Sequence, residues 1–150
     1  MDKIEKEKVI AKISEYIDLK AIPFGKPENG LLEIVKRDPM YGGKGVVYML
    51  SLFEAGELVN NRFAQYMVLL NKGDEAGFHE HGDRNEQEIY CIVNGEGEYR
   101  ERINDEEIEK TITLKKGNLA SIQGIGNYHS IINIGNEPLI IFVITTNQPK

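Results

Sequence analysis

The first twenty residues carry apolar side chains at a helical spacing. These apolar positions are Val9, Ile10, Ile13, Tyr16 and Ile17, and the remaining residues of this segment are mostly charged. This pattern predicts an amphipathic helix from residue 2 to about residue 20, with one apolar face packed against the rest of the protein. Asp2 precedes Glu5 by three positions, which is the spacing of a helix-capping pair. Proline and glycine residues then mark a loop that ends near residue 30.

From residue 31 onward the pattern changes to short apolar or alternating runs. Turn sequences such as Asn94-Gly95 and Gly135-Asn136 separate these runs. Many short strands at this spacing predict an all-β sandwich or barrel rather than alternating βαβ units. We therefore expect residues 1–30 to form a helix and loop that pack on a β-barrel domain of residues 31–150. The expected strands are Leu31–Lys36, Gly45–Leu52, Arg62–Leu70, Gly77–His81, Gln87–Val93, Gly97–Ile103, Ile108–Leu114, Asn118–Ile122, Tyr128–Ile134 and Leu139–Thr145.

The last of these strands is apolar at nearly every position. The run Leu139–Ile144 has no polar residue, so both of its faces must be covered. In a barrel one face points into the lumen, and the other needs a helix, a second sheet or another subunit. The N-terminal helix and a subunit interface are both plausible covers, and on this ground we predict a homodimer.

Length and charge narrow the class of protein. A chain of 150 residues is long enough for one domain with a single core. The net charge of −6 argues against nucleic acid as a partner, because no basic excess exists to neutralise phosphates. No stretch approaches the ~20 apolar residues that span a bilayer, so no membrane partner is expected.

The charged N-terminus lacks the apolar core of an export signal, and the single cysteine, Cys91, cannot form an internal disulfide. We predict a cytoplasmic protein.

The three histidines of the chain all fall in two glycine-framed motifs. The first reads Gly73-x5-His79-x-His81-x6-Glu88-x6-Gly95, and the second reads Gly117-x6-Gly124-x-Gly126-x2-His129-x3-Asn133. Residues two apart on a strand point to the same face, so His79 and His81 can bind one ion. Glu88 lies on the next expected strand, and closure of a barrel can bring His129 to the same place. These four residues are our predicted ligands for a divalent transition metal such as Zn, Ni, Fe or Mn.

The two motifs resemble the signature of the cupin superfamily over about residues 62–146. The run from Glu88 to Glu98 is also typical of that family. The resemblance implies a small single-domain cupin, whose fold is a double-stranded β-helix or jelly-roll barrel with the metal in its lumen. Its members include dioxygenases, sugar-phosphate isomerases and lyases, so the resemblance does not choose a reaction.

The sequence departs from the family pattern in two places. The gap between His81 and Glu88 is two residues longer than usual, which enlarges the loop Gly82–Asn85 at the mouth of the expected pocket. Glu86 would satisfy the shorter gap but would miss the spacing to Gly95. Both glutamates have the same strand parity, and we favour Glu88 as the ligand because it lies inside the apolar strand. The other departure is Gly124, where the family usually has proline.

Several residues near the expected site have roles that parity suggests. Tyr90 shares a face with Glu88 and is our candidate catalytic group, as a hydrogen-bond donor or base. The alternative is that its ring only packs in the core of the barrel. Gln65 is either a pocket donor or an outward residue. Glu80 should point away from the metal, and the Asn133 amide should hydrogen-bond a turn.

The sequence thus leaves two functional classes open. The first is a metal-dependent enzyme that acts on a small polar metabolite, with the ion as Lewis acid in isomerase, epimerase or lyase chemistry, or as an oxygen-activating centre in a dioxygenase. The second is a non-catalytic module that binds or senses a small, sugar-like molecule. Both imply a small-molecule partner.

Overall fold

The computed structural model describes residues 1–54, 57, 63–82 and 85–147. Within these residues one helix, α1 (Lys3–Ser14), precedes ten strands, in the order that the sequence predicts. The strands are β1 (Glu33–Arg37), β2 (Val47–Ser51), β3 (Phe63–Leu69), β4 (Glu75–His79), β5 (Glu86–Asn94), β6 (Glu96–Ile103), β7 (Lys110–Lys115), β8 (Leu119–Gln123), β9 (Asn127–Asn133) and β10 (Leu139–Asn147).

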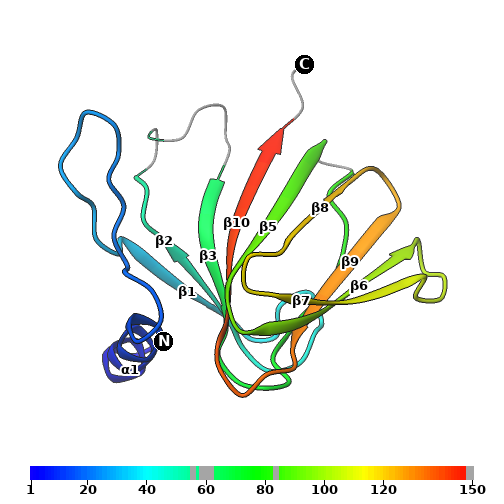
Figure 1. Cartoon of the computed structure of the whole chain (residues 1–150), viewed down its shortest axis with the longest axis horizontal. Helices are drawn as coiled ribbons and strands as arrows, with labels where there is room; N and C mark the ends of the chain where they lie inside the picture. The colour runs from blue at the N-terminus through cyan, green and yellow to red at the C-terminus, as the bar shows by residue number, and fades with distance from the viewer. Residues whose placement is uncertain (55–56, 58–62, 83–84, 148–150) are drawn as a thin grey trace.

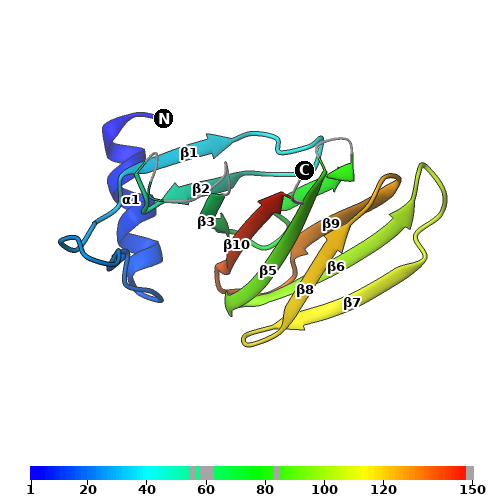
Figure 2. The same cartoon turned by 90° about the horizontal axis from the view of Figure 1, so that it is seen from above.

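The strands form two antiparallel sheets that face each other (Figures 1 and 2). The larger sheet has the order β1-β2-β3-β10-β5-β8, and the smaller has the order β4-β9-β6-β7. The C-terminal strand β10 lies between β3 and β5, so strands that are distant in the sequence become neighbours. This crossing order is that of a jelly roll, and it confirms the predicted all-β barrel with a short N-terminal helix.

Alternate side chains of both sheets meet between them and form the main core. Met67, Ile92 and Ile141 come from the larger sheet, and Tyr99 and Ile131 come from the smaller. All five are at most 2% exposed. Because successive side chains of a strand point to opposite faces, strand parity decides which residues enter this space.

A second core cluster joins α1 to the outer face of the larger sheet. Val9 and Ile13 of the helix pack with Leu50, Val68 and Ile140 of the sheet. Figure 2 shows the helix crossing one end of this face. The Asp2 carboxylate accepts a hydrogen bond of 2.8 Å from the Glu5 amide, which confirms the predicted cap.

The helix ends at Ser14, earlier than the predicted residue 20. The amides of Tyr16 and Ile17 both donate to the Ile13 carbonyl, which closes the last turn. The chain then leaves the helix axis, and Leu19 and Ala21 enter the same buried cluster as Ile13. Tertiary packing, rather than the spacing of apolar residues, therefore sets this end of the helix.

The outer face of β10 is covered over part of its length. Ile140 packs in the cluster under α1, but Phe142 and Ile144, further along the same face, are only half-buried. The Tyr66 ring lies beside Phe142, with centroids 5.2 Å apart. The helix thus accounts for one end of this apolar face, and the homodimer that would cover the rest stays a prediction.

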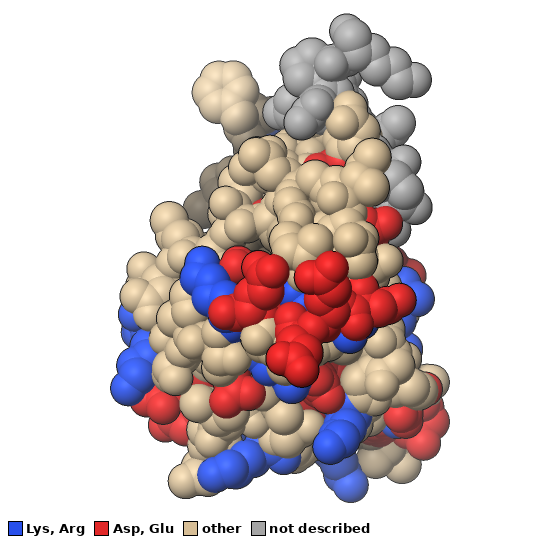
Figure 3. Space-filling view, turned by 90° about the vertical axis from the view of Figure 1, so that its right-hand side faces the viewer, with Lys and Arg blue, Asp and Glu red and all other residues tan. Residues whose placement is uncertain are grey.

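The opposite end of the molecule carries an acidic surface. Figure 3 shows acidic side chains gathered on the side where the β6–β7 connection lies. Asp105, Glu106, Glu107 and Glu109 of that connection are exposed, as expected for a solvated hairpin. In the described part of the chain, no helix is long and apolar enough to cross a membrane. The cytoplasmic location stays a prediction.

Candidate metal centre

The structure brings all four predicted ligand residues together between the two sheets. His79 is the last residue of β4, His81 follows two positions later, and His129 lies on β9. Glu88 reaches the same point from β5 in the opposite sheet. All four side chains are buried, with residue exposures of 8% or less. We call this group the histidine–glutamate cluster.

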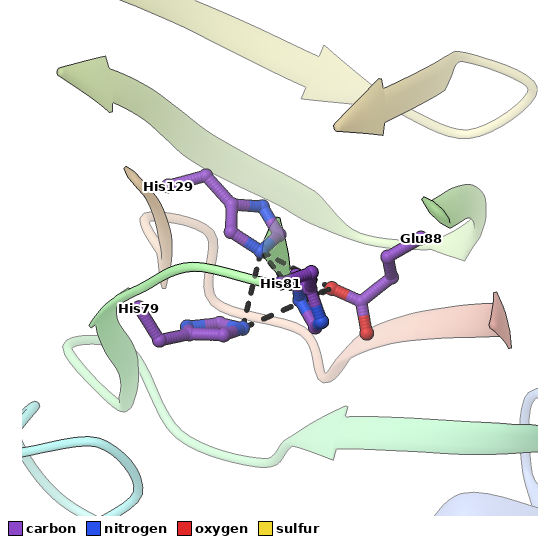
Figure 4. Close-up of side chains that lie close together, drawn as sticks. All are labelled: His79, His81, Glu88 and His129. Atoms are coloured by element: carbon purple, nitrogen blue, oxygen red, sulfur yellow. Dashed lines mark hydrogen bonds and ion pairs between the residues drawn. The ribbon is translucent and has the colours of Figure 1, made fainter. Parts of the chain in front are cut away.

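One atom from each residue points to a common centre (Figure 4). The Glu88 Oε2 atom lies 3.0 Å from Nε2 of His81 and 3.1 Å from Nε2 of His129. It lies 3.8 Å from Nε2 of His79. The Nε2 atom of His129 lies 3.1 Å from that of His79 and 3.4 Å from that of His81. Three imidazole nitrogens and one carboxylate oxygen therefore converge.

The outward nitrogens of two of these rings are held by other groups. Nδ1 of His79 lies 2.8 Å from the Gly77 carbonyl oxygen, which can only accept. Nδ1 of His81 lies 3.2 Å from a carboxylate oxygen of Glu86. When the proton is on Nδ1, both Nε2 atoms present a lone pair to the centre, which is the form that binds a metal. This is the orientation that protein metal sites impose on their histidines. Without a metal, an Nε2 atom can instead carry the proton and donate to Glu88.

The spacing of these atoms fits a transition metal. Bonds of about 2.0–2.2 Å from zinc to imidazole nitrogen or carboxylate oxygen, at angles of about 90–110°, place neighbouring ligand atoms roughly 2.8–3.6 Å apart. Four of the five distances given above fall in that range. When all three Nε2 atoms are unprotonated, their lone pairs and the Glu88 oxygen face one another without a donor, and a cation at the centre satisfies them. The cluster could therefore bind a metal, and its donors suit Zn, Ni, Fe or Mn.

The protonation states favour a cation as well. Burial would raise the pKa of Glu88, but hydrogen bonds from the three histidines hold that pKa well below its usual range. Burial lowers the pKa of His129 to about 4, despite the opposing effect of Glu88. The cluster thus presents a carboxylate and a neutral imidazole at neutral pH, which are the forms that bind metals.

Comparison with known proteins places the fold in a family. No family model matches the chain. An oxalate-binding protein of Thermotoga maritima is 33% identical over 100 residues, which are 67% of this chain and 75% of that protein. The chain belongs to the cupin superfamily.

Solved structures agree with this placement. A crystal structure from Thermotoga maritima, described as a predicted oxalate decarboxylase, has a TM-score of 0.66 at 28% identity and covers 77% of this chain and 92% of that one. The cupin domain of Schizosaccharomyces pombe Cnp3 has a TM-score of 0.55 at 20% identity, over 68% of this chain and 65% of that one. The second likeness concerns the fold alone.

The path of the cupin chain at His81 differs from the prediction. The expected strand included both His79 and His81, but β4 ends at His79. The Glu80 carboxylate accepts a hydrogen bond of 2.5 Å from the Gly126 amide, so it points away from the cluster as parity predicts. Gly124 and Gly126 have φ of 96° and 79°, which explains why glycine suits this turn. Residues 83 and 84 of the lengthened loop lie outside the described residues.

The structure assigns different positions to the two competing glutamates. Glu88 points into the histidine–glutamate cluster, whereas Glu86 contacts the outward nitrogen of His81. Equal strand parity made them indistinguishable by face alone. The structure separates them, because the two ring nitrogens of His81 face different carboxylates.

Tyr41 lies against the cluster, although sequence reasoning did not select it. Its ring stacks on His79 with centroids 3.8 Å apart and planes 18° from parallel. Its φ of 50° is unusual for a bulky residue. The turn that carries Tyr41 packs on Gly77, where a β-carbon would overlap the Tyr41 carbonyl and the Gly43 amide. The run Tyr41-Gly42-Gly43 was the available signal, and it marked a turn without indicating what the turn contacts.

Two other predicted neighbours occupy the lumen. Tyr90 is 3% exposed, and its ring centroid lies 5.2 Å from that of His129. Burial, the charge of Glu88 and a hydrogen bond with Glu88 raise the pKa of Tyr90 well above its usual value. Gln65 is directly opposite Val143, a core residue, so it faces the lumen rather than the exterior.

Asn133 is a framework residue, as predicted. Its amide donates to the Leu69 and Glu137 carbonyls at 3.0 Å, and its side-chain oxygen accepts from the Gly135 amide. It therefore ties the end of β9 to β3 and to the following turn. Thr145 lies opposite Glu88 in register and is 1% exposed. Its hydroxyl has no hydrogen-bond partner in the structure as described.

Proposed function

We propose that this cupin holds a divalent transition metal at His79, His81, Glu88 and His129 and binds a small carboxylate anion there. The observation that carries the proposal is the convergence of three Nε2 atoms and one Glu88 oxygen at metal-ligand spacing. Four protein ligands leave one or two positions for water or a ligand on a five- or six-coordinate ion. The bound ion supplies a Lewis acid that polarises a coordinated oxygen.

The carboxylate is proposed from the relative's chemistry together with the site. The 33% identical relative is an oxalate-binding protein. In this chain the Thr145 hydroxyl is buried beside Glu88 with no partner among the described residues, so it is free to donate to a ligand oxygen. A hydroxyl left unpaired in a buried place costs stability, which a polar ligand would offset.

Metal content is the direct test. Protein purified without added metal is expected to retain close to one equivalent of Zn, Ni, Fe or Mn by elemental analysis. The His79→Ala/His81→Ala variant should retain none above background. Calorimetry should then detect oxalate binding to the metal-loaded protein and none to chelator-treated protein. The proposal is contradicted if wild type and the double variant contain equal amounts of metal, or if chelator treatment does not change oxalate binding.

A catalytic role is the second candidate, and Tyr90 is the observation that favours it. Its hydroxyl lies by Glu88 in the buried lumen, where it could donate a hydrogen bond to a metal-bound carboxylate. The reaction would be of the lyase, isomerase or dioxygenase type. Incubation of metal-loaded protein with oxalate, with formate and carbon dioxide measured, separates catalysis from binding. Tyr90→Phe should lower turnover at unchanged metal content; turnover unaffected by this change removes Tyr90 from the chemistry.

A further inference from the structure

A cleft of about 400 Å³ adjoins the histidine–glutamate cluster. Its walls are β1, β2, β3 and the turn that follows β1. We call it the Arg37 cleft, and its lining includes Glu33, Val35, Arg37, Tyr41, Met49 and Gln65. Tyr41 lines the cleft and also contacts the cluster, because its ring stacks on His79. Its volume lies in the range of roughly 300–1,000 Å³ that small-molecule sites occupy.

Among the described residues that line the cleft, Arg37 is the one cationic group. Arg37 is exposed and makes no hydrogen bond or ion pair with any part of the chain that the structure describes. Its neighbour Lys36 faces the other way and pairs with Glu5 of α1 at 2.8 Å. A guanidinium binds a carboxylate through two parallel hydrogen bonds, so Arg37 is suited to a planar anion.

Apolar side chains line the cleft beside Arg37. Val35 and Met49 are opposite each other in register and both line the cleft. Their side chains offer contact to methylene groups, and Gln65 adds one amide from β3. Oxalate has two carbons and no methylene group, so it would leave this surface unfilled.

We propose that the cleft seats the second half of a dicarboxylate longer than oxalate. One carboxylate lies at the metal, the carbon chain lies against Val35 and Met49, and the second carboxylate pairs with Arg37. This inference rests on the proposed metal and carboxylate site and adds to it the length and charge of the ligand. Arg37 thereby selects for a second anionic group.

The test compares two ligands of equal length in the zinc-loaded protein. Malate and 2-hydroxybutyrate share a 2-hydroxycarboxylate head, and only malate has a second carboxylate. Calorimetry should give about tenfold tighter binding of malate, since a charge-assisted hydrogen bond at an exposed site is worth about that much. Arg37→Gln should abolish this preference while leaving zinc content and oxalate affinity unchanged.

Glu33→Gln is the matched control, because Glu33 lies on the same face of β1 with the opposite charge. It should keep or increase the preference for malate. The inference is overturned if wild type binds the two ligands equally, if Arg37→Gln keeps the preference, or if Glu33→Gln loses it equally. None of these results contradicts the metal site. If wild type binds neither zinc nor oxalate, the proposed function fails. In that case the preference for malate over 2-hydroxybutyrate is measured without metal in wild type and in Arg37→Gln. A preference that only wild type shows would support the role of Arg37 in the cleft, and its absence would exclude that role.

Discussion

A carboxylate oxygen of Glu86 lies 3.2 Å from Nδ1 of His81, on the edge of the ring opposite to Glu88. Glu86 is therefore placed to hold the proton on Nδ1 and to keep Nε2 available for a metal. Such outer carboxylates typically change metal affinity by about 10–100-fold when removed.

We expect Glu86→Gln to lower metal affinity by roughly tenfold at unchanged stoichiometry. Glu88→Gln should have a larger effect, because it replaces the converging carboxylate with a neutral amide, which is a weaker metal ligand. Competition with a chromophoric chelator measures both. Glu106→Gln, in the exposed β6–β7 connection, is the control and should match wild type. Equal losses in Glu86→Gln and Glu88→Gln would instead make Glu86 a ligand.

Gly77 sets the orientation of His79 and also receives the Tyr41 turn. A β-carbon at residue 77 would overlap the Tyr41 carbonyl and the Gly43 amide, both of which are backbone. Gly77→Ala should therefore lower the free energy of unfolding by about 1–3 kcal/mol and weaken metal binding. Gly30→Ala is the control, since nothing lies within 4 Å of its β-carbon. Chemical denaturation measures the unfolding free energy, and titration measures the metal affinity. Equal values for the two variants would exclude this role for Gly77.

Acid should destabilise the metal-free protein. Burial lowers the pKa of His129 to about 4, whereas an unfolded histidine titrates near 6.5. Between these values the unfolded chain binds more protons, so stability falls as the pH drops, with a slope of at most about 1.4 kcal/mol per pH unit from this group. Glu88, whose pKa is held low, adds to the loss below its ordinary titration range near pH 4.5.

The measurement is the urea midpoint of chelator-treated protein between pH 7.5 and pH 5. His129→Gln removes the histidine but keeps a polar side chain, and it should show a shallower pH dependence than wild type. Parallel curves for the two proteins would show that another group governs the acid response.

Ile13 anchors α1 to the barrel and is fully buried. Ile13→Ala should cost about 2–5 kcal/mol of unfolding free energy, because it leaves a cavity under the helix. Ile4→Ala, on the same helix with the residue 65% exposed, should change stability by less than about 0.5 kcal/mol. Retention of metal by Ile13→Ala would show that the helix supports the barrel without shaping the site.

The half-buried outer face of β10 supports a test of the predicted homodimer. Phe142→Ser places a polar group where a partner would pack, and Ile22→Ser changes a side chain that is 83% exposed on a distant loop. Light scattering should give a mass of two chains for wild type and Ile22→Ser, and one chain for Phe142→Ser. A wild-type mass of one chain rules out the dimer.

The sequence by itself determined the strand pattern and the chemistry of the cluster. Alternation along the runs put Tyr90 on the same face as Glu88, and the spacing of His79, His81, Glu88 and His129 identified which groups converge. These are local properties, because strand parity depends only on position within a run. The same parity could not separate Glu86 from Glu88, since two residues two apart share a face.

Only the tertiary structure decided what surrounds the cluster. The stacking of Tyr41 on His79, the end of α1 at Ser14 and the cleft beside Arg37 all arise where distant segments meet. Each depends on the relative placement of two elements, such as the close backbone approach at Gly77. At these points the packing between segments that are far apart in the chain decides the structure. The residue pattern within either segment does not predict that packing.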